Sequence, residues 1–141
     1  MMVLVDTSVW SLALRRHAKD LSLGQKQIRD ELAELIREGR AQLLGPVRQE
    51  LLSGIRSEPQ YEQLRSELRA FDSPALAVED YEEAARANNH CRRRGVNGSV
   101  IDFLICAVAM RRDWQIFTMD IDFSSYAKHV PIRLHTVREE A

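Results

Sequence analysis

The stretch that decides the fold is Met2-Val3-Leu4-Val5-Asp6-Thr7-Ser8-Val9-Trp10. Its first part, residues 2–5, is a short apolar run, which is typical of a strand buried on both faces. A helix is predicted directly afterwards, over residues 8–16. A buried strand that leads straight into a helix is the unit from which parallel sheets are built, because parallel strands need a crossover connection.

Short apolar strands and helices go on alternating along the chain. The helix over residues 99–112 is apolar almost all round and is therefore predicted to be buried. This alternation predicts an α/β fold with a parallel sheet that helices cover on both faces. The other expected strands span residues 42–44, 75–78, 115–118 and 132–134, and the other expected helices span residues 25–38, 46–52, 58–71, 79–94 and 123–127.

Length and composition predict a globular protein of one domain over residues 1–141. The chain is 45% hydrophobic and 29% charged, which is ordinary for a folded domain and argues against disorder or a fibrous structure. No apolar run reaches the ~18 residues of a membrane span, and no secretory signal is recognisable. Two cysteines without ligand spacing fit a reducing compartment, so we expect a cytoplasmic location. The four histidines are scattered without ligand spacing, which argues against a histidine-based zinc site.

Basic and acidic residues are nearly equal in number, but the basic residues are mostly arginine. The chain has 20 basic and 21 acidic residues, which gives no support to a highly basic nucleic-acid coat. Of the 20 basic residues, 17 are Arg and only 3 are Lys. The planar guanidinium of arginine matches the geometry of phosphate groups better than the lysine ammonium does, although a genome rich in G and C would produce the same bias towards arginine.

Acidic residues follow the predicted strands at the points where those strands end. Asp6 follows the first strand, Glu50 lies one turn into the helix after the second, and Asp120 and Asp122 follow the strand over residues 115–118. In a parallel sheet these places share the carboxyl edge, where open α/β sheets bind ligands. Asp102 joins them from an otherwise apolar stretch, and buried carboxylates are normally paired or bound to metal.

Each of these acidic residues also has a structural explanation. Asp6 fits a helix N-cap, Asp102 fits a capping box that begins at Ser99, and Asp120 fits the start of a turn. Glu50 fits a solvated helix residue or a partner of a nearby arginine. Capping accounts for each position, but it does not account for the convergence of all of them on one sheet edge.

Several carboxylates close together repel one another unless a hard cation neutralises them. Mg²⁺ and Mn²⁺ prefer oxygen ligands, so a cluster of Asp and Glu without His or Cys favours one of these ions. Such a site suits phosphodiester hydrolysis, in which metal activates a water and stabilises the leaving oxygen.

Four motifs now carry a resemblance to PIN-domain proteins, especially VapC-type toxins of bacterial toxin–antitoxin pairs. The resemblance covers essentially the whole chain, and the motifs occur in the family's order. They are Leu4-Val5-Asp6-Thr7-Ser8-Val9-Trp10, Pro46-Val47-Arg48-Gln49-Glu50-Leu51-Leu52-Ser53-Gly54, Asp102-Phe103-Leu104-Ile105-Cys106-Ala107-Val108-Ala109 and Phe117-Thr118-Met119-Asp120-Ile121-Asp122-Phe123.

The resemblance implies a PIN-like fold with a parallel sheet of four to five strands, and a Mg²⁺- or Mn²⁺-dependent endoribonuclease that hydrolyses RNA. The carboxylates that would bind metal and carry catalysis are Asp6, Glu50, Asp102 and Asp120, and Asp122 would supplement or replace Asp120. It also implies a homodimer and a VapB-like antitoxin partner, in a heterotetramer or larger complex. The alternative is a catalytically weak PIN-like binding module that acts in regulation through its antitoxin complex.

Further residues near these motifs are candidates for supporting roles. The hydroxyls of Thr7 and Ser8 would orient Asp6 or bind a phosphate, or would simply cap the helix. Ser99 is a candidate RNA contact or a helix cap. The triplet Arg92, Arg93 and Arg94 is a candidate RNA contact, and it also suits the negative end of a helix dipole.

Overall fold

Three parallel strands form the sheet in the computed structural model, which describes residues 1–139. Strand β1 (Val3–Val5) lies between β2 (Ala41–Gln42) and β3 (Gln115–Phe117). Leu4 pairs with Gln42 on one side and with Ile116 on the other. All three residues of β1 are buried, which explains why its sequence is an unbroken apolar run.

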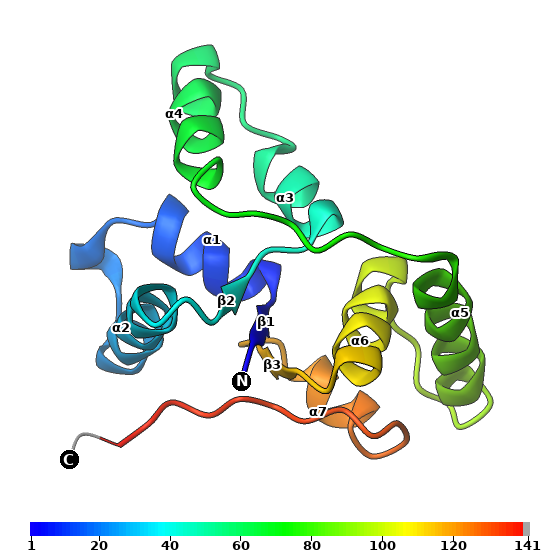
Figure 1. Ribbon diagram of the computed structural model, residues 1–141. Helices are drawn as coiled ribbons and strands as arrows, with labels where there is room; N and C mark the ends of the chain where they lie inside the picture. Colours follow the sequence, from blue (N-terminus) through cyan, green and yellow to red (C-terminus); the bar gives the residue numbers. More distant parts are fainter. Residues whose placement is uncertain (140–141) are drawn as a thin grey trace.

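Helices cover both faces of this sheet (Figure 1). Helices α1 (Thr7–Arg15) and α2 (Leu23–Arg37) lie on one side, with the short 3-10 helix Ala18–Asp20 between them. Helices α5 (Val78–Arg92) and α6 (Val100–Arg112) lie on the other side. The remaining helices are α3 (Gly45–Leu52), α4 (Glu58–Leu68) and α7 (Asp122–Tyr126). The predicted α/β fold with a parallel sheet is therefore confirmed.

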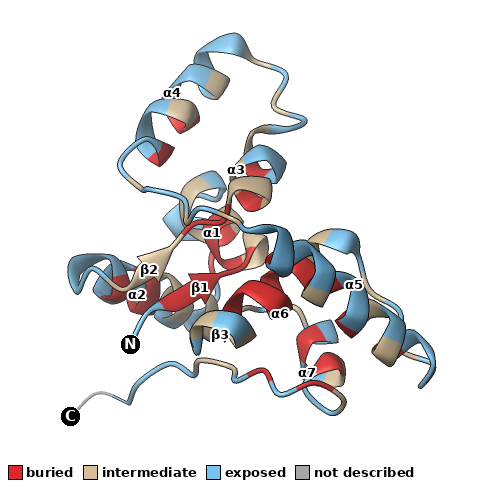
Figure 2. Cartoon of the chain, turned by 45° about the vertical axis from the view of Figure 1, so that its right-hand side comes forward, coloured by how far each residue is buried: buried red, intermediate tan, exposed pale blue. Residues whose placement is uncertain are grey.

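Helix α6 is the buried partner of the sheet, as its sequence predicts. Seven successive residues, from Phe103 to Ala109, are buried. Figure 2 shows this buried helix beside β1, with the more exposed α5 packed outside it. Full burial of one large apolar side chain stabilises a fold by roughly 1.5–3 kcal/mol, so this helix is a major source of stability. In residues 1–139, no helix is long and apolar enough to cross a membrane.

The predicted strand over residues 75–78 is wrong. Residues 72–77 have no regular structure, and Val78 begins α5. Side chains satisfy this backbone in place of a sheet ladder: Arg112 donates to the carbonyl of Ala75 at 3.0 Å, and the Asp80 carboxylate accepts from the N–H of Ala77 at 2.8 Å. Arg112 is distant in sequence from Ala75, so local apolar character could not reveal this contact.

The last predicted strand is reduced to one bridge, between Leu134 and Ile116. The N–H of Ile116 donates to the carbonyl of Arg133 at 2.8 Å, and the N–H of His135 donates to the carbonyl of Ile116 at 2.7 Å. The described residues thus contain three strands and this bridge, and the larger strand count implied by the family resemblance is not confirmed. The other predicted elements are present with ends shifted by a few residues.

A buried carboxylate holds the C-terminal segment against α2. Glu31 is 5% exposed, and its Oε2 lies 2.6 Å from Nε2 of His135. A carboxylate accepts hydrogen bonds, so Nε2 of His135 carries the hydrogen. Arg138 also donates from Nε to Oε2 of Glu31, at 3.0 Å. This attachment keeps the segment beside β3, an outer strand of the three-stranded sheet.

Candidate metal centre

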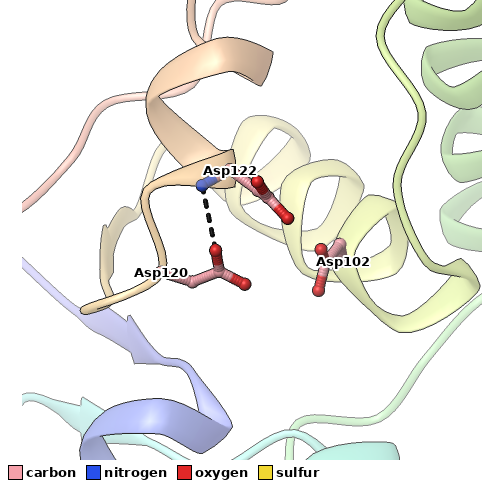
Figure 3. A group of neighbouring side chains, drawn as sticks. All are labelled: Asp102, Asp120 and Asp122. Atoms are coloured by element: carbon pink, nitrogen blue, oxygen red, sulfur yellow. Dashed lines mark hydrogen bonds between the residues drawn. The ribbon is translucent and has the colours of Figure 1, made fainter.

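Three carboxylates converge at the carboxyl edge of the sheet. Asp102 lies in the first turn of α6, Asp120 lies between β3 and α7, and Asp122 is the first residue of α7. One oxygen of each lies within 4.8 Å of the others, and Figure 3 shows the three side chains around a common space. Residues from two separate parts of the chain therefore form one oxygen-only group, which is the donor set that Mg²⁺ and Mn²⁺ prefer.

Asp6 joins this group through Thr118. Asp6 directly follows β1 and is 6% exposed. The hydroxyl of Thr118 donates to Oδ2 of Asp6 at 2.8 Å and accepts from the N–H of Asp120 at 2.9 Å. Asp6 occupies the N-cap position of α1, but its side chain makes no capping hydrogen bond. Its carboxylate is therefore directed to the sheet edge, and capping does not explain it.

Ser8 supplies a second hydroxyl to the same oxygen of Asp6. Its Oγ donates to Oδ2 of Asp6 at 2.8 Å and accepts from the N–H of Met119 at 3.0 Å. Both hydroxyls are thus fixed by the backbone after β3, and together they hold one oxygen of Asp6. Thr7 differs, since its Oγ1 is buried and has no hydrogen-bond partner within residues 1–139.

Asp120 has the structural role that its position suggests, at the start of a turn. Its Oδ1 accepts from the N–H of Asp122 at 2.9 Å, which fixes the turn into α7 (Figure 3). The turn explanation is therefore correct for this oxygen, and it is compatible with metal binding through the other. Asp122 is exposed, whereas Asp120 is partly buried.

Asp102 is held by a residue that the sequence did not reveal. The Tyr126 hydroxyl donates to Oδ2 of Asp102 at 2.6 Å. Burial raises the pKa of Asp102, and the negative charges of Asp6 and Asp120 add to this increase, whereas the hydrogen bond from Tyr126 opposes it. The mutual effect of these carboxylates is the repulsion that a bound cation would relieve.

Ser99 acts as the N-cap of α6. Its Oγ accepts from the N–H of Asp102 at 3.0 Å, so Ser99 is the helix cap that the sequence allowed for. The cap fixes the first turn of the helix and with it the backbone of Asp102.

Glu50 is not brought into the group of three. It is exposed on α3, and within residues 1–139 it forms no ion pair with Arg48 or Arg56. It lines a groove of about 640 Å³ between α3, α5 and α6 that also includes Tyr81 and Val100. Glu50 therefore borders a neighbouring groove, and its metal-binding role stays a prediction.

The arginine triplet lies at the C-terminal end of α5. Arg92 is the last helical residue and Arg93 is the C-cap, and both are exposed. Arg94 donates from Nη1 to the carbonyl of His90 at 3.0 Å. These positions fit stabilisation of the helix end, and RNA contact by the triplet stays a prediction.

Sequence reasoning missed Thr118 and Tyr126 as supporting residues. Thr118 stands two residues before Asp120, in the fourth motif, so its proximity to that acid was visible. Tyr126 carried no comparable signal, because its contact with Asp102 spans 24 residues and depends on how α7 packs on α6.

Comparison with known proteins gives a consistent result. Residues 3–129 match the PIN domain family, whereas no curated protein matches the chain significantly in sequence. Among solved structures, FitAcB from Neisseria gonorrhoeae is similar with a TM-score of 0.74 and 18% identity, over 96% of this chain and 97% of that one. VapBC2 from Rickettsia felis, bound to a DNA fragment from its promoter, has a TM-score of 0.72 and 14% identity, over 96% and 98%. VapBC-1 from nontypeable Haemophilus influenzae has a TM-score of 0.70 and 12% identity, over 96% and 97%.

Proposed function

This chain belongs to the PIN domain family, and on that premise we propose that it is a Mg²⁺- or Mn²⁺-dependent endoribonuclease and the toxin of a toxin–antitoxin pair. The observation that carries the proposal is the convergence of Asp102, Asp120 and Asp122 within 4.8 Å, with Asp6 tied to them through Thr118. Four carboxylates with no histidine or cysteine among them form a site for a hard cation.

In this proposal Asp6, Asp102 and Asp120 hold the metal, and Asp122 and Glu50 supplement them. A bound Mg²⁺ or Mn²⁺ would supply an activated water for attack on the phosphodiester and would stabilise the charge that develops on it. The chain contributes rigid positioning: Ser8 and Thr118 fix Asp6, and the turn at Asp122 fixes Asp120. Carboxylates held in this way need no rearrangement when the cation binds, which favours preorganised catalysis.

The proposed partners are an RNA substrate and a VapB-like antitoxin. The similar structures include FitAB bound to the IR36 DNA fragment and VapBC2 bound to a promoter fragment. By analogy, we expect a homodimer of this chain that assembles with its antitoxin into a heterotetramer or a larger complex. We also propose a single PIN-like domain over residues 1–141, a cytoplasmic location, and a sheet of four to five strands, in which the bridge at Leu134 marks the fourth.

The test is RNA cleavage by the purified chain, free of antitoxin. We expect cleavage of total RNA with Mg²⁺ or Mn²⁺, no cleavage with excess EDTA, and loss of cleavage in Asp6→Asn and in Asp102→Asn. Asp72→Asn is the matched control, because Asp72 is exposed in an irregular segment. Full activity in Asp102→Asn would overturn the assigned role of that residue.

The same preparation tests the alternative of a binding module. That alternative expects no Mn²⁺ binding at millimolar concentration and no cleavage, together with a stable antitoxin complex that binds DNA. Mapping of the RNA ends produced by the active chain would then identify the substrate.

A further inference from the structure

The hydroxyl of Tyr126 makes a short contact with the candidate metal ligand Asp102. The donor–acceptor distance to Oδ2 is 2.6 Å, which is in the range of charge-assisted O–H···O⁻ hydrogen bonds. One oxygen of Asp102 is thus occupied by a neutral donor, which fixes the rotation of the carboxylate and leaves Oδ1 for a cation.

Tyr126 is itself held in place by its neighbours. It is completely buried on α7, and its ring centroid lies 4.9 Å from that of Phe103 and 5.2 Å from that of Phe123. Phe103 directly follows Asp102 in α6. The same packing therefore fixes the phenol and the backbone that carries the carboxylate, so the hydroxyl has no freedom to leave.

Gly98 provides the space for this arrangement. A Cβ atom at position 98 would lie 2.7 Å from Cζ of Tyr126 and 2.8 Å from Cε2 of Phe103, and closer still to the tyrosine hydroxyl. Both contacts are too short for carbon atoms, and the surrounding rings are buried. A side chain at this position would therefore displace the phenol from Asp102.

We propose that Tyr126 is a positioning residue, which holds the Asp102 carboxylate in the orientation that binds the divalent cation, and that Gly98 is required for its placement. This inference rests on the proposed metal-dependent function. Groups that orient a ligand carboxylate typically change metal affinity by 10- to 100-fold when they are removed.

The experiment compares Mn²⁺ binding in the wild-type chain and in Tyr126→Phe, which removes one oxygen atom and adds none. Free Mn²⁺ is measured by electron paramagnetic resonance during titration. We expect the Kd to rise 10- to 100-fold, and RNA cleavage to recover as the Mn²⁺ concentration is raised. Tyr61→Phe on α4 is the matched control and should leave the Kd unchanged. A Tyr126→Phe Kd within twofold of wild type would overturn the proposal, even if the melting temperature falls, because a hydroxyl of purely structural importance would affect stability alone.

Gly98→Ala tests whether the placement of Tyr126 matters, because this variant keeps the tyrosine hydroxyl but displaces it from Asp102. We expect weakened Mn²⁺ binding here too, and no further loss in the double variant Gly98→Ala/Tyr126→Phe, since both changes break the same contact. A wild-type Kd in a folded Gly98→Ala protein would show that this glycine is not required. Circular dichroism verifies folding, and Tyr126→Phe alone decides the role of the tyrosine if Gly98→Ala does not fold.

The outcomes separate this inference from the proposed function. If the wild-type chain binds no Mn²⁺, the proposed function and this inference fail together. If the wild-type chain binds Mn²⁺ and cleaves RNA while Tyr126→Phe behaves identically, only the inference fails.

Discussion

The hydroxyl of Thr118 donates a 2.8 Å hydrogen bond to Oδ2 of Asp6 across 112 residues of sequence. The same hydroxyl accepts from the N–H of Asp120 at 2.9 Å. It therefore connects the ends of two neighbouring parallel strands, β1 and β3, and sets the position of one candidate ligand relative to another.

Thr118→Val should weaken both metal binding and cleavage. Valine keeps the shape of the side chain but cannot donate to Asp6, so we expect a loss of about 10- to 100-fold in Mn²⁺ affinity. Ser8→Ala alone should have a smaller effect of the same kind, because Thr118 still holds Oδ2 of Asp6 and still accepts from the N–H of Asp120. The double variant Ser8→Ala/Thr118→Val should lose more Mn²⁺-binding free energy than the sum of the losses in the two single variants.

Mn²⁺ titration measures the effect, and Thr136→Val, at an exposed position, is the control. An unchanged Kd in the double variant would contradict the orienting role.

Asp120→Asn should reduce cleavage more than Asp122→Asn. Asparagine at position 120 still accepts from the N–H of residue 122 and so preserves the turn, but it removes the negative charge. Asp120 is partly buried and its backbone N–H is fixed by Thr118. Asp122 is exposed, so a water molecule can more easily take its place as a metal ligand. Cleavage rates at fixed Mg²⁺ for the two variants decide the order. A larger loss in Asp122→Asn would make that residue the main fourth ligand.

Part of this site was predictable from the sequence because strand ends determine it. Asp6 and Asp120 each follow an apolar run, so their meeting at one sheet edge follows from parallel pairing alone. Glu50 was expected there on the same basis, but it is the sixth residue of α3 and lies eight residues beyond the end of β2, and the structure leaves it exposed in the adjoining groove. Tyr126 could not be predicted, since its contact with Asp102 depends on packing between α6 and α7.

In the fold as well, elements that depend on their own sequence were predictable, whereas segments that depend on contacts with distant residues were not. Strand β1 and helix α6 were predictable because burial on all sides leaves an uninterrupted apolar sequence. Residues 75–78 are apolar too, but their backbone is satisfied by Arg112 and Asp80, which local propensity does not include. Leu134 likewise pairs with β3 at a single bridge, because the segment is held by side chains rather than by a sheet ladder.

Asp80→Asn should destabilise the protein at neutral pH and have less effect in acid. Asp80 is fully buried and lies 2.6 Å from Arg111 and 2.8 Å from Arg112. Hydrogen bonds from Arg112, Ala77 and Arg111 outweigh the effect of burial and hold the pKa of Asp80 well below its ordinary value of 3.8. Both arginines reach solvent, so we expect a loss of roughly 2 kcal/mol in the free energy of unfolding, below the usual cost of breaking a buried pair.

The pH dependence of this effect follows from the lowered pKa of Asp80. A carboxyl with a lowered folded-state pKa stabilises the fold fully above its unfolded pKa and loses this contribution as the pH falls through the folded value. The difference between wild type and Asp80→Asn should therefore narrow between pH 7 and pH 3 in urea denaturation. Glu79→Gln, at the exposed neighbouring position, is the control. An equal difference at both pH values would exclude ionisation of Asp80 as the source.

Glu31→Gln should release the C-terminal segment from β3. Glu31 is buried against His135 and Arg138, and both of these residues lie in the segment that carries the bridge at Leu134. An amide keeps the shape of the side chain but loses the charge that pairs with Arg138, and its NH₂ group opposes Nε2–H of His135 if its orientation is reversed. Hydrogen bonds to charged groups contribute roughly 1.5–3 kcal/mol each, so the attachment should open locally more often.

Hydrogen exchange measures this opening at the backbone amides of Ile116 and His135. The first amide donates to the carbonyl of Arg133 and the second donates to the carbonyl of Ile116, so both hydrogen bonds join β3 to the C-terminal segment. We expect faster exchange at both in Glu31→Gln and no change in Glu34→Gln, whose side chain is exposed on the same helix. Unchanged protection would show that the bridge holds this segment without Glu31.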